Sequence, residues 1–267
     1  MNNQFRYTAP ADEKPLDNLV TDGGYASIFR TIACVGDSLA SGEFETFDPE
    51  KNERHFYDMF PYSWGQYLAR MAGCTVHNFS RGGMTASEYC QGYAESKGWW
   101  DPALAAQAYI VGLGANDLFG AHQPLGEMSD IHPEDPEQNA DTFTGWYAKL
   151  IMKYKAIQPD AKFFLVTLAR ETHWQADEDN PMARAVAAHA SRLRELADYF
   201  DNTYVIDLHT YAPPHDRPFF ERFYLHGHMN PMGYRVIAEQ IGSYIDYIIR
   251  HNPRDFVNVP FIGKGIM

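Results

Sequence analysis

Four short segments of the chain carry side chains suited to acyl transfer. Ser38 lies in CVGDSLASGE after an apolar run, and a hydroxyl in a tight strand-to-helix turn suits a nucleophile. His228, in FYLHGHMNPMGY, is a candidate base for that hydroxyl. The backbone N–H of Gly83, in NFSRGGMTASE, and the amide of Asn116, in GLGANDLFG, suit donors to a developing oxyanion. Together they supply the groups that ester hydrolysis requires.

Each of these residues also has an ordinary structural explanation. A lone serine after Gly-Asp suits a helix cap, and a Gly-Gly pair suits a turn that needs positive φ. An asparagine at a bend often bonds its own loop, and a histidine near a helix start is more often structural than catalytic. The position of all four at the same end of strand candidates, after four of the five, is what favours chemistry.

The elements that must position these residues alternate between strand and helix. The strand candidates are largely apolar, as expected for strands covered on both faces, and span about 28–35, 74–79, 108–113, 162–169 and 203–208. Helical patterns follow them at about 63–71, 85–96, 139–157, 180–200 and 230–249. This order predicts an α/β fold with one parallel sheet of about five strands and helices on both faces.

The loops that leave the strand candidates are long. They span about 36–61, 114–137, 170–180 and 209–229, whereas most loops that enter the strands are short. Ligands of open α/β sheets bind beyond the carboxyl ends of the strands. We therefore expect the site at the edge of the sheet where these long loops lie.

The 267 residues are expected to form a single domain. Its core covers about 28–250, with an N-terminal arm, 1–27, and a C-terminal tail, 251–267, that pack on it. The tail is apolar and suits packing either on the domain or on a second copy in a homo-oligomer.

The composition excludes several classes of partner. With 22 Lys and Arg against 35 Asp and Glu, the net charge is −13, so the chain should repel nucleic acid and anionic membrane surfaces. Three cysteines without CxxC spacing argue against a disulfide framework. The N-terminus lacks the pattern of a secretory signal, and no apolar run is long enough to span a membrane. We expect a cytoplasmic protein.

The four segments resemble the four sequence blocks of the SGNH, or GDSL-type, hydrolases. GDSLASGE, NFSRGGMT, GANDL and HMNPMGY occur in the family's order across about residues 30 to 245. The resemblance implies a cytoplasmic bacterial-type esterase with a three-layer α/β/α, flavodoxin-like fold. It also implies Ser38 as nucleophile and His228 as base. The oxyanion hole would consist of the N–H groups of Ser38 and Gly83 and the amide of Asn116, with no metal or cofactor.

The chain departs from the family at one position. The family usually has an acid three residues before its histidine, as D-x-x-H, and position 225 is leucine here. A backbone carbonyl could orient His228 instead, as could a carboxylate from Asp207, Asp216 or Glu221. The sequence leaves this choice open, because such triads are defined by geometry and not by sequence position.

Several functions stay open from the sequence. Our first expectation is hydrolysis of a small-molecule ester, either a small-acyl ester or a carbohydrate O-acetyl ester, because no flexible apolar lid is evident. An acyltransferase, a lipase or a thioesterase could use the same site. Less favoured are a metal-dependent hydrolase that uses His226, His228 and Asp207 or His209, and a flavodoxin-like binding protein without chemistry.

Aromatic residues near the expected site have two interpretations. Trp99 and Trp100 follow the helical pattern at about 85–96, and Trp174, Phe119 and the pair Phe219-Phe220 lie on or near the long loops. Their rings could pack on a sugar or an acyl chain, although such residues more often belong to the core.

Overall fold

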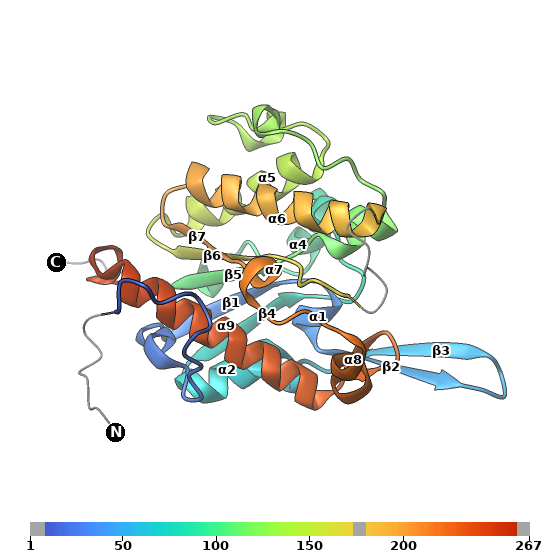
Figure 1. Cartoon of the computed structure of the whole chain (residues 1–267). Helices are drawn as coiled ribbons and strands as arrows, with labels where there is room; N and C mark the ends of the chain where they lie inside the picture. Colours follow the sequence, from blue (N-terminus) through green and yellow to red (C-terminus); the bar gives the residue numbers. More distant parts are fainter. Residues whose placement is uncertain (1–8, 173–179, 261–267) are drawn as a thin grey trace, which may run out of the picture.

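A five-stranded parallel sheet forms the centre of the molecule in the computed structural model, which describes residues 9–172 and 180–260 (Figure 1). The strand order is β4-β1-β5-β6-β7, and adjacent strands pair in parallel. The strands are β1 (Thr31–Gly36), β4 (Thr75–Ser80), β5 (Ala108–Gly112), β6 (Lys162–Val166) and β7 (Thr203–Ile206). The structure confirms the five predicted strands to within a few residues at their ends.

Both faces of this sheet are buried, which explains the almost unbroken apolar runs. In β1, Ile32 and Cys34 belong to one hydrophobic cluster, and their neighbours Ala33 and Val35 belong to the other. Successive side chains of a strand point to opposite faces, so a strand between two helical layers must be apolar throughout.

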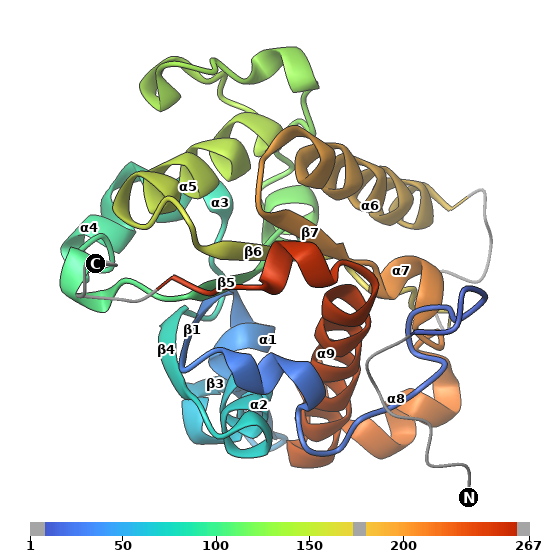
Figure 2. The same ribbon diagram turned by 90° about the vertical axis from the view of Figure 1, so that its left-hand side faces the viewer.

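The long helices form a layer on each face, as Figures 1 and 2 show. One layer contains α2 (Trp64–Ala72) and α9 (Pro231–His251), and the other contains α5 (Phe143–Ile157) and α6 (Pro181–Tyr199). Side chains cap their first turns as the sequence suggests: the Ser63 hydroxyl accepts from Gln66 N. The three-layer α/β/α fold is thus confirmed.

The segment expected as one helix at about 85–96 is interrupted. It consists of α3 (Ala86–Glu88), a π-helical turn (Tyr89–Tyr93) and α4 (Ala94–Ser96). Gly92 adopts φ 122°, a conformation outside the helical region that glycine reaches easily, and this breaks the regular helix.

Additional elements occupy the long loops. The loop after β1 holds the short helix α1 (Ser38–Ser41) and an antiparallel hairpin of β2 (Glu43–Asp48) and β3 (Glu53–Asp58), which projects from the body in Figure 1. The loop after β7 holds α7 (Leu208–Tyr211), α8 (Arg217–Phe223), β8 (Tyr224–Leu225) and β9 (His228–Met229). Short 3-10 helices span Gly24–Ile28, Phe60–Tyr62, Pro102–Leu104, Met128–Asp130, Pro136–Gln138 and Pro253–Phe256, and Asn116–Gly120 forms a second π turn.

The described parts of both terminal segments contact the domain. Glu13 pairs with Arg250 at 2.6 Å, and Val20 N donates to Ser243 Oγ at 2.8 Å. In the tail, the carbonyl of Pro260 accepts from Gln107 Nε2 at 2.8 Å. These contacts tie the arm and the tail to α9 and to the entrance of β5. No helix within the described residues is long and apolar enough to cross a membrane.

Candidate active site

A cavity of about 550 Å³ opens at the carboxyl ends of the strands and brings three of the expected residues together. Ser38, Asn116 and His228 all line it, although they come from the loops after β1, β5 and β7. We call it the catalytic cavity. Its wall also includes Arg54 of the hairpin and Phe220 of α8.

Ser38 is the first residue of α1, directly after β1. The preceding Asp37 caps this helix, because its carboxylate accepts from Leu39 N at 3.1 Å. Burial raises the pKa of Asp37 to about 7, an effect that the nearby Asp117 carboxyl reinforces and the bond from Leu39 opposes. The turn therefore fixes the Ser38 backbone and leaves its side chain on the cavity wall.

The two expected oxyanion donors lie differently. The Asn116 amide lines the catalytic cavity and donates to the carbonyl of Met84 at 3.2 Å, so it spans the loops after β4 and β5. Gly83 occupies the exposed tip of the turn after β4, with φ 73°, and lies outside the lining of the cavity. A Cβ there would meet nothing within 4 Å, so the positive φ alone favours glycine.

His228 lies between two glutamates of the hairpin. Its Nδ1 is 3.1 Å from Glu45 Oε2, and its Nε2 is 3.1 Å from Glu43 Oε1. The Phe56 ring and the imidazole form a T-shaped pair, with ring centroids 5.8 Å apart. Two carboxyl groups therefore flank the imidazole, one at each ring nitrogen.

Glu45 is the more deeply buried of the two acids, with a side chain only 2% exposed. The same Oε2 that faces His228 accepts from Gly227 N at 2.9 Å, and Oε1 accepts from Arg54 Nη1 at 2.9 Å. A buried carboxylate is stable when donors surround it in this way. Glu45 therefore fixes both the backbone before His228 and the orientation of its ring.

Burial raises the pKa of the Glu43 carboxyl, and His228 opposes that shift. The backbone of Glu43 is held in place by Tyr234 of α9, whose hydroxyl donates to the Glu43 carbonyl at 2.7 Å. Tyr234 is the last residue of the HMNPMGY segment, so this segment supports the hairpin as well as supplying the histidine.

Strand alternation explains why both glutamates reach the site. Glu43 and Glu45 lie on one face of β2, and the residues paired with them on β3, Asp58 and Phe56, lie on the same face. Gly42 ends α1 with φ 75°, and a Cβ there would collide with the backbone of Met59 and Ser63. Glycine at this position allows the chain to turn from the helix directly into the hairpin.

The carboxylates proposed from the sequence to orient His228 have other partners. Asp207 binds Arg194 Nε at 2.9 Å and Thr210 N at 3.0 Å. Asp216 caps α8 through Phe219 N, and Glu221 pairs with Arg217 on the surface. Each of these three acids therefore has a role in its own local structure. The group beside His228 Nδ1 is the carboxylate of Glu45, and not one of these three acids or a backbone carbonyl.

Leu225, at the place of the usual family acid, is the cross-strand neighbour of His228 in the β8–β9 hairpin and is 41% exposed. The sequence did contain a signal for the replacement. Charged and apolar residues alternate in Glu43-Phe44-Glu45, as in a strand with one polar face, within the segment 36–61 that is predicted to be a loop.

The aromatic residues divide between core and site. Trp99 and Trp100 pack around Tyr89 in the core. Phe220 lines the catalytic cavity, and Phe119 lines a second cavity next to it. Phe219 stacks on His215, with centroids 4.0 Å apart, and Trp174 falls outside the described residues.

The residues named for a metal site do not form a cluster. His226 lies at the β8–β9 turn, where its ring faces Phe47, while Asp207 binds Arg194 and His209 follows it in α7. Among the residues that the structure describes, no group of three or more His, Cys, Asp or Glu is arranged to hold a metal ion.

Comparison with known proteins identifies the class to which this fold and site belong. The family model of the GDSL-like lipase/acylhydrolases matches residues 34–236, and the chain belongs to this family. It is accordingly a hydrolase of the carboxylic ester class. No curated protein matches the chain.

Solved structures with the same fold include three with 17–18% sequence identity. A possible lipase from Chitinophaga pinensis has a TM-score of 0.52 at 17% identity, with 84% of this chain and 98% of that chain covered. A Lactobacillus plantarum protein has a TM-score of 0.57 at 18% identity, with 82% of this chain and 97% of that chain covered. A family 3 carbohydrate esterase from Clostridium thermocellum has a TM-score of 0.52 at 18% identity, with 83% of this chain and 97% of that chain covered. At these identities the likeness establishes the fold.

Proposed function

We propose that the protein hydrolyses carboxylic esters through an acyl-enzyme on Ser38, with His228 as the base and Glu45 as the residue that orients it. The observation that carries this proposal is the position of His228. It lines the same cavity as Ser38, and its Nδ1 faces a buried carboxylate. A serine, a histidine and an acid in these roles define a catalytic triad by geometry.

In the proposed reaction, Ser38 Oγ bonds to the ester carbonyl carbon while its proton passes to His228 Nε2. The negative charge that develops on the carbonyl oxygen is stabilised by N–H donors, for which Ser38 N, Gly83 N and the Asn116 amide are the candidates. Protonated His228 then gives its proton to the leaving alkoxide as the carbon–oxygen bond breaks. Water repeats the sequence and releases the acid.

Glu45 contributes by stabilising one state of the imidazole. With Nδ1–H donated to the Glu45 carboxylate, Nε2 carries the lone pair that accepts the serine proton. The same carboxylate stabilises the imidazolium once the proton has moved. In the present structure the partner of Nε2 is Glu43 Oε1. The reaction therefore requires Nε2 to leave Glu43 and to contact Ser38 Oγ instead.

The alcohol part of the substrate would occupy the open catalytic cavity. A sugar is our proposal for this part, because the exposed Phe47 and Phe56 rings, on the hairpin face that carries Glu45, suit packing against it. The acyl part expected from the sequence is small, such as acetyl. An acyltransferase would use the same steps with an alcohol in place of water. A lipase or thioesterase would need space for a longer acyl group.

The direct test is labelling with a fluorophosphonate probe, which reacts with an activated serine whatever the natural substrate. We expect the wild type to be labelled, Ser38→Ala to be unlabelled and His228→Ala to be labelled at least a hundred times more slowly. Hydrolysis of p-nitrophenyl acetate should decline in parallel. Normal labelling or turnover of a folded Ser38→Ala protein would disprove the assignment.

A further inference from the structure

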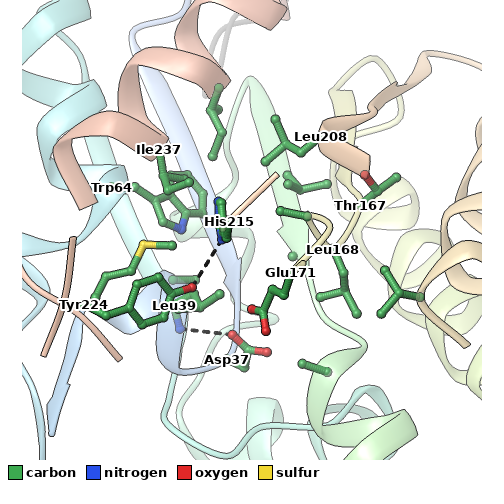
Figure 3. Close-up of a pocket in the computed structure, with 18 of the residues that line it drawn as sticks. Asp37, Leu39, Trp64, Thr167, Leu168, Glu171, Leu208, His215, Tyr224 and Ile237 are labelled. Carbon is green, nitrogen blue, oxygen red and sulfur yellow. Dashed lines mark hydrogen bonds between the residues drawn. The ribbon is translucent and has the colours of Figure 1, made fainter. Parts of the chain in front are cut away.

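A second cavity, of about 210 Å³, lies next to the catalytic cavity, and its lining includes residues of α1, β6 and α9. Most of its wall is apolar and consists of buried or half-buried side chains from several elements (Figure 3). Examples are Trp64, Val166, Val186, Leu208, Ile237 and Ile241. We call it the inner cavity.

The inner cavity borders the site of Ser38. Five residues line both cavities, namely Asp37, Leu39, Ala115, Glu171 and Tyr224. Asp37 and Leu39 flank Ser38 in the chain, so the shared boundary runs immediately beside the serine. A group attached to Ser38 Oγ therefore lies beside the boundary of the inner cavity.

The wall of the inner cavity is polar at the boundary shared with the catalytic cavity and mainly apolar further inside. The carboxyl groups of Asp37 and Glu171 belong to the shared boundary. Deeper polar groups have partners: Tyr224 and His215 bond at 3.4 Å, and Thr167 Oγ1 accepts from His209 N at 2.9 Å. The remainder of the wall therefore presents mainly carbon atoms to the space inside.

We infer that the inner cavity binds the acyl chain of the ester, and that the enzyme prefers straight acyl groups of medium length over acetyl groups. This inference rests on the proposed acyl-enzyme at Ser38 and changes its expected substrate class. Protein interiors are close-packed, and an apolar void of this size lowers stability unless a ligand fills it. An engineered apolar cavity of about 150 Å³ holds benzene, so the inner cavity has room for roughly six to eight carbons.

The acyl part suits this cavity better than the alcohol part does. The acyl carbon is bonded to Ser38 during the reaction, so its chain must fit beside Asp37 and Leu39. The leaving alcohol must depart to solvent, which the wider catalytic cavity allows. A sugar would also leave many hydroxyl groups without partners among the apolar side chains of the inner cavity.

The experiment is a chain-length series of p-nitrophenyl esters from acetate to palmitate. Burial of each methylene raises kcat/KM by at most about fourfold. We expect a rise from acetate to hexanoate or octanoate, and a fall beyond decanoate because longer chains exceed the volume of the cavity. A maximum at acetate, or equal rates from acetate to octanoate, would overturn the inference.

A variant of the cavity wall tests whether this space causes the preference. Ala169 is half-buried and lines the inner cavity, and Ala169→Leu would fill part of it. We expect the octanoate-to-acetate ratio of kcat/KM to fall at least tenfold. Ala185→Leu, the same change at a half-buried residue of α6 outside the cavity lining, should leave the ratio unchanged.

A second variant covers the case in which Ala169→Leu does not fold. Val186→Phe fills the cavity from α6 and should lower the same ratio. An unchanged ratio in either folded variant would refute the acyl assignment. Fluorophosphonate labelling separates the two hypotheses: labelling of Ser38 with no chain-length preference refutes only the acyl pocket, whereas absence of labelling refutes the proposed function.

Discussion

Replacement of Glu45 by glutamine should lower kcat/KM for ester hydrolysis by about 30- to 150-fold while the fold is retained. Oε2 of Glu45 accepts from both His228 Nδ1 and Gly227 N, and a glutamine oxygen can occupy the same position. Arg54, which binds Oε1, has a side chain 65% exposed and can turn to solvent. The substitution therefore removes mainly the negative charge.

The magnitude follows from the position of that charge. Two unit charges about 4 Å apart interact by about 4 kcal/mol at the effective dielectric constant of a protein site. A neutral amide still accepts a hydrogen bond from the imidazolium, and this retains about 1–2 kcal/mol. The net loss of about 2–3 kcal/mol in the transition state corresponds to about 30- to 150-fold, since about 1.4 kcal/mol is tenfold in rate.

The assay is steady-state hydrolysis of a p-nitrophenyl ester, with thermal unfolding to confirm the fold. Glu53→Gln is the matched control, because Glu53 is an exposed glutamate of the same hairpin, and it should retain wild-type activity. Glu43→Gln should reduce activity less than Glu45→Gln, because Glu43 faces Nε2, which the reaction must free. In a His228→Ala background, Glu45→Gln should cause no further loss. Activity of folded Glu45→Gln within threefold of wild type would refute the role of Glu45.

Two further substitutions test the surroundings of the site. In Gly227→Ala, the new Cβ would overlap the Glu45 carboxylate, so we expect kcat to fall at least tenfold and unfolding free energy to fall by about 1–3 kcal/mol. Wild-type kinetics for this variant would show that the Glu45–His228 contact is not required. Asp37→Asn keeps a helix cap but removes a buried acid whose pKa is raised to about 7. Because the folded state holds this proton to higher pH than the unfolded state, wild-type stability falls between about pH 4 and pH 7. Asp37→Asn should therefore raise the melting temperature at pH 8 more than at pH 5, and an equal change at both pH values would contradict the buried, protonated state.

The sequence by itself determined the sheet and the edge that bears the site. Strands buried on both faces must be apolar along their whole length, so β1 and β5 are visible as unbroken apolar runs. Ser38 and Asn116 follow these strands directly, so their place at the carboxyl edge could be predicted from local order alone. The GDSL-type blocks added the family and the ester hydrolase class, which the family model confirms.

Only the tertiary structure decided which acid faces His228 and what space adjoins Ser38. Glu45 and His228 are 183 positions apart, and their contact depends on a hairpin whose strands have an exposed face and so lack an apolar run. The inner cavity is enclosed by residues of β6, α6 and α9 that look like ordinary core in sequence. A local pattern records whether a side chain is buried, but the shape left between buried side chains depends on how distant elements pack.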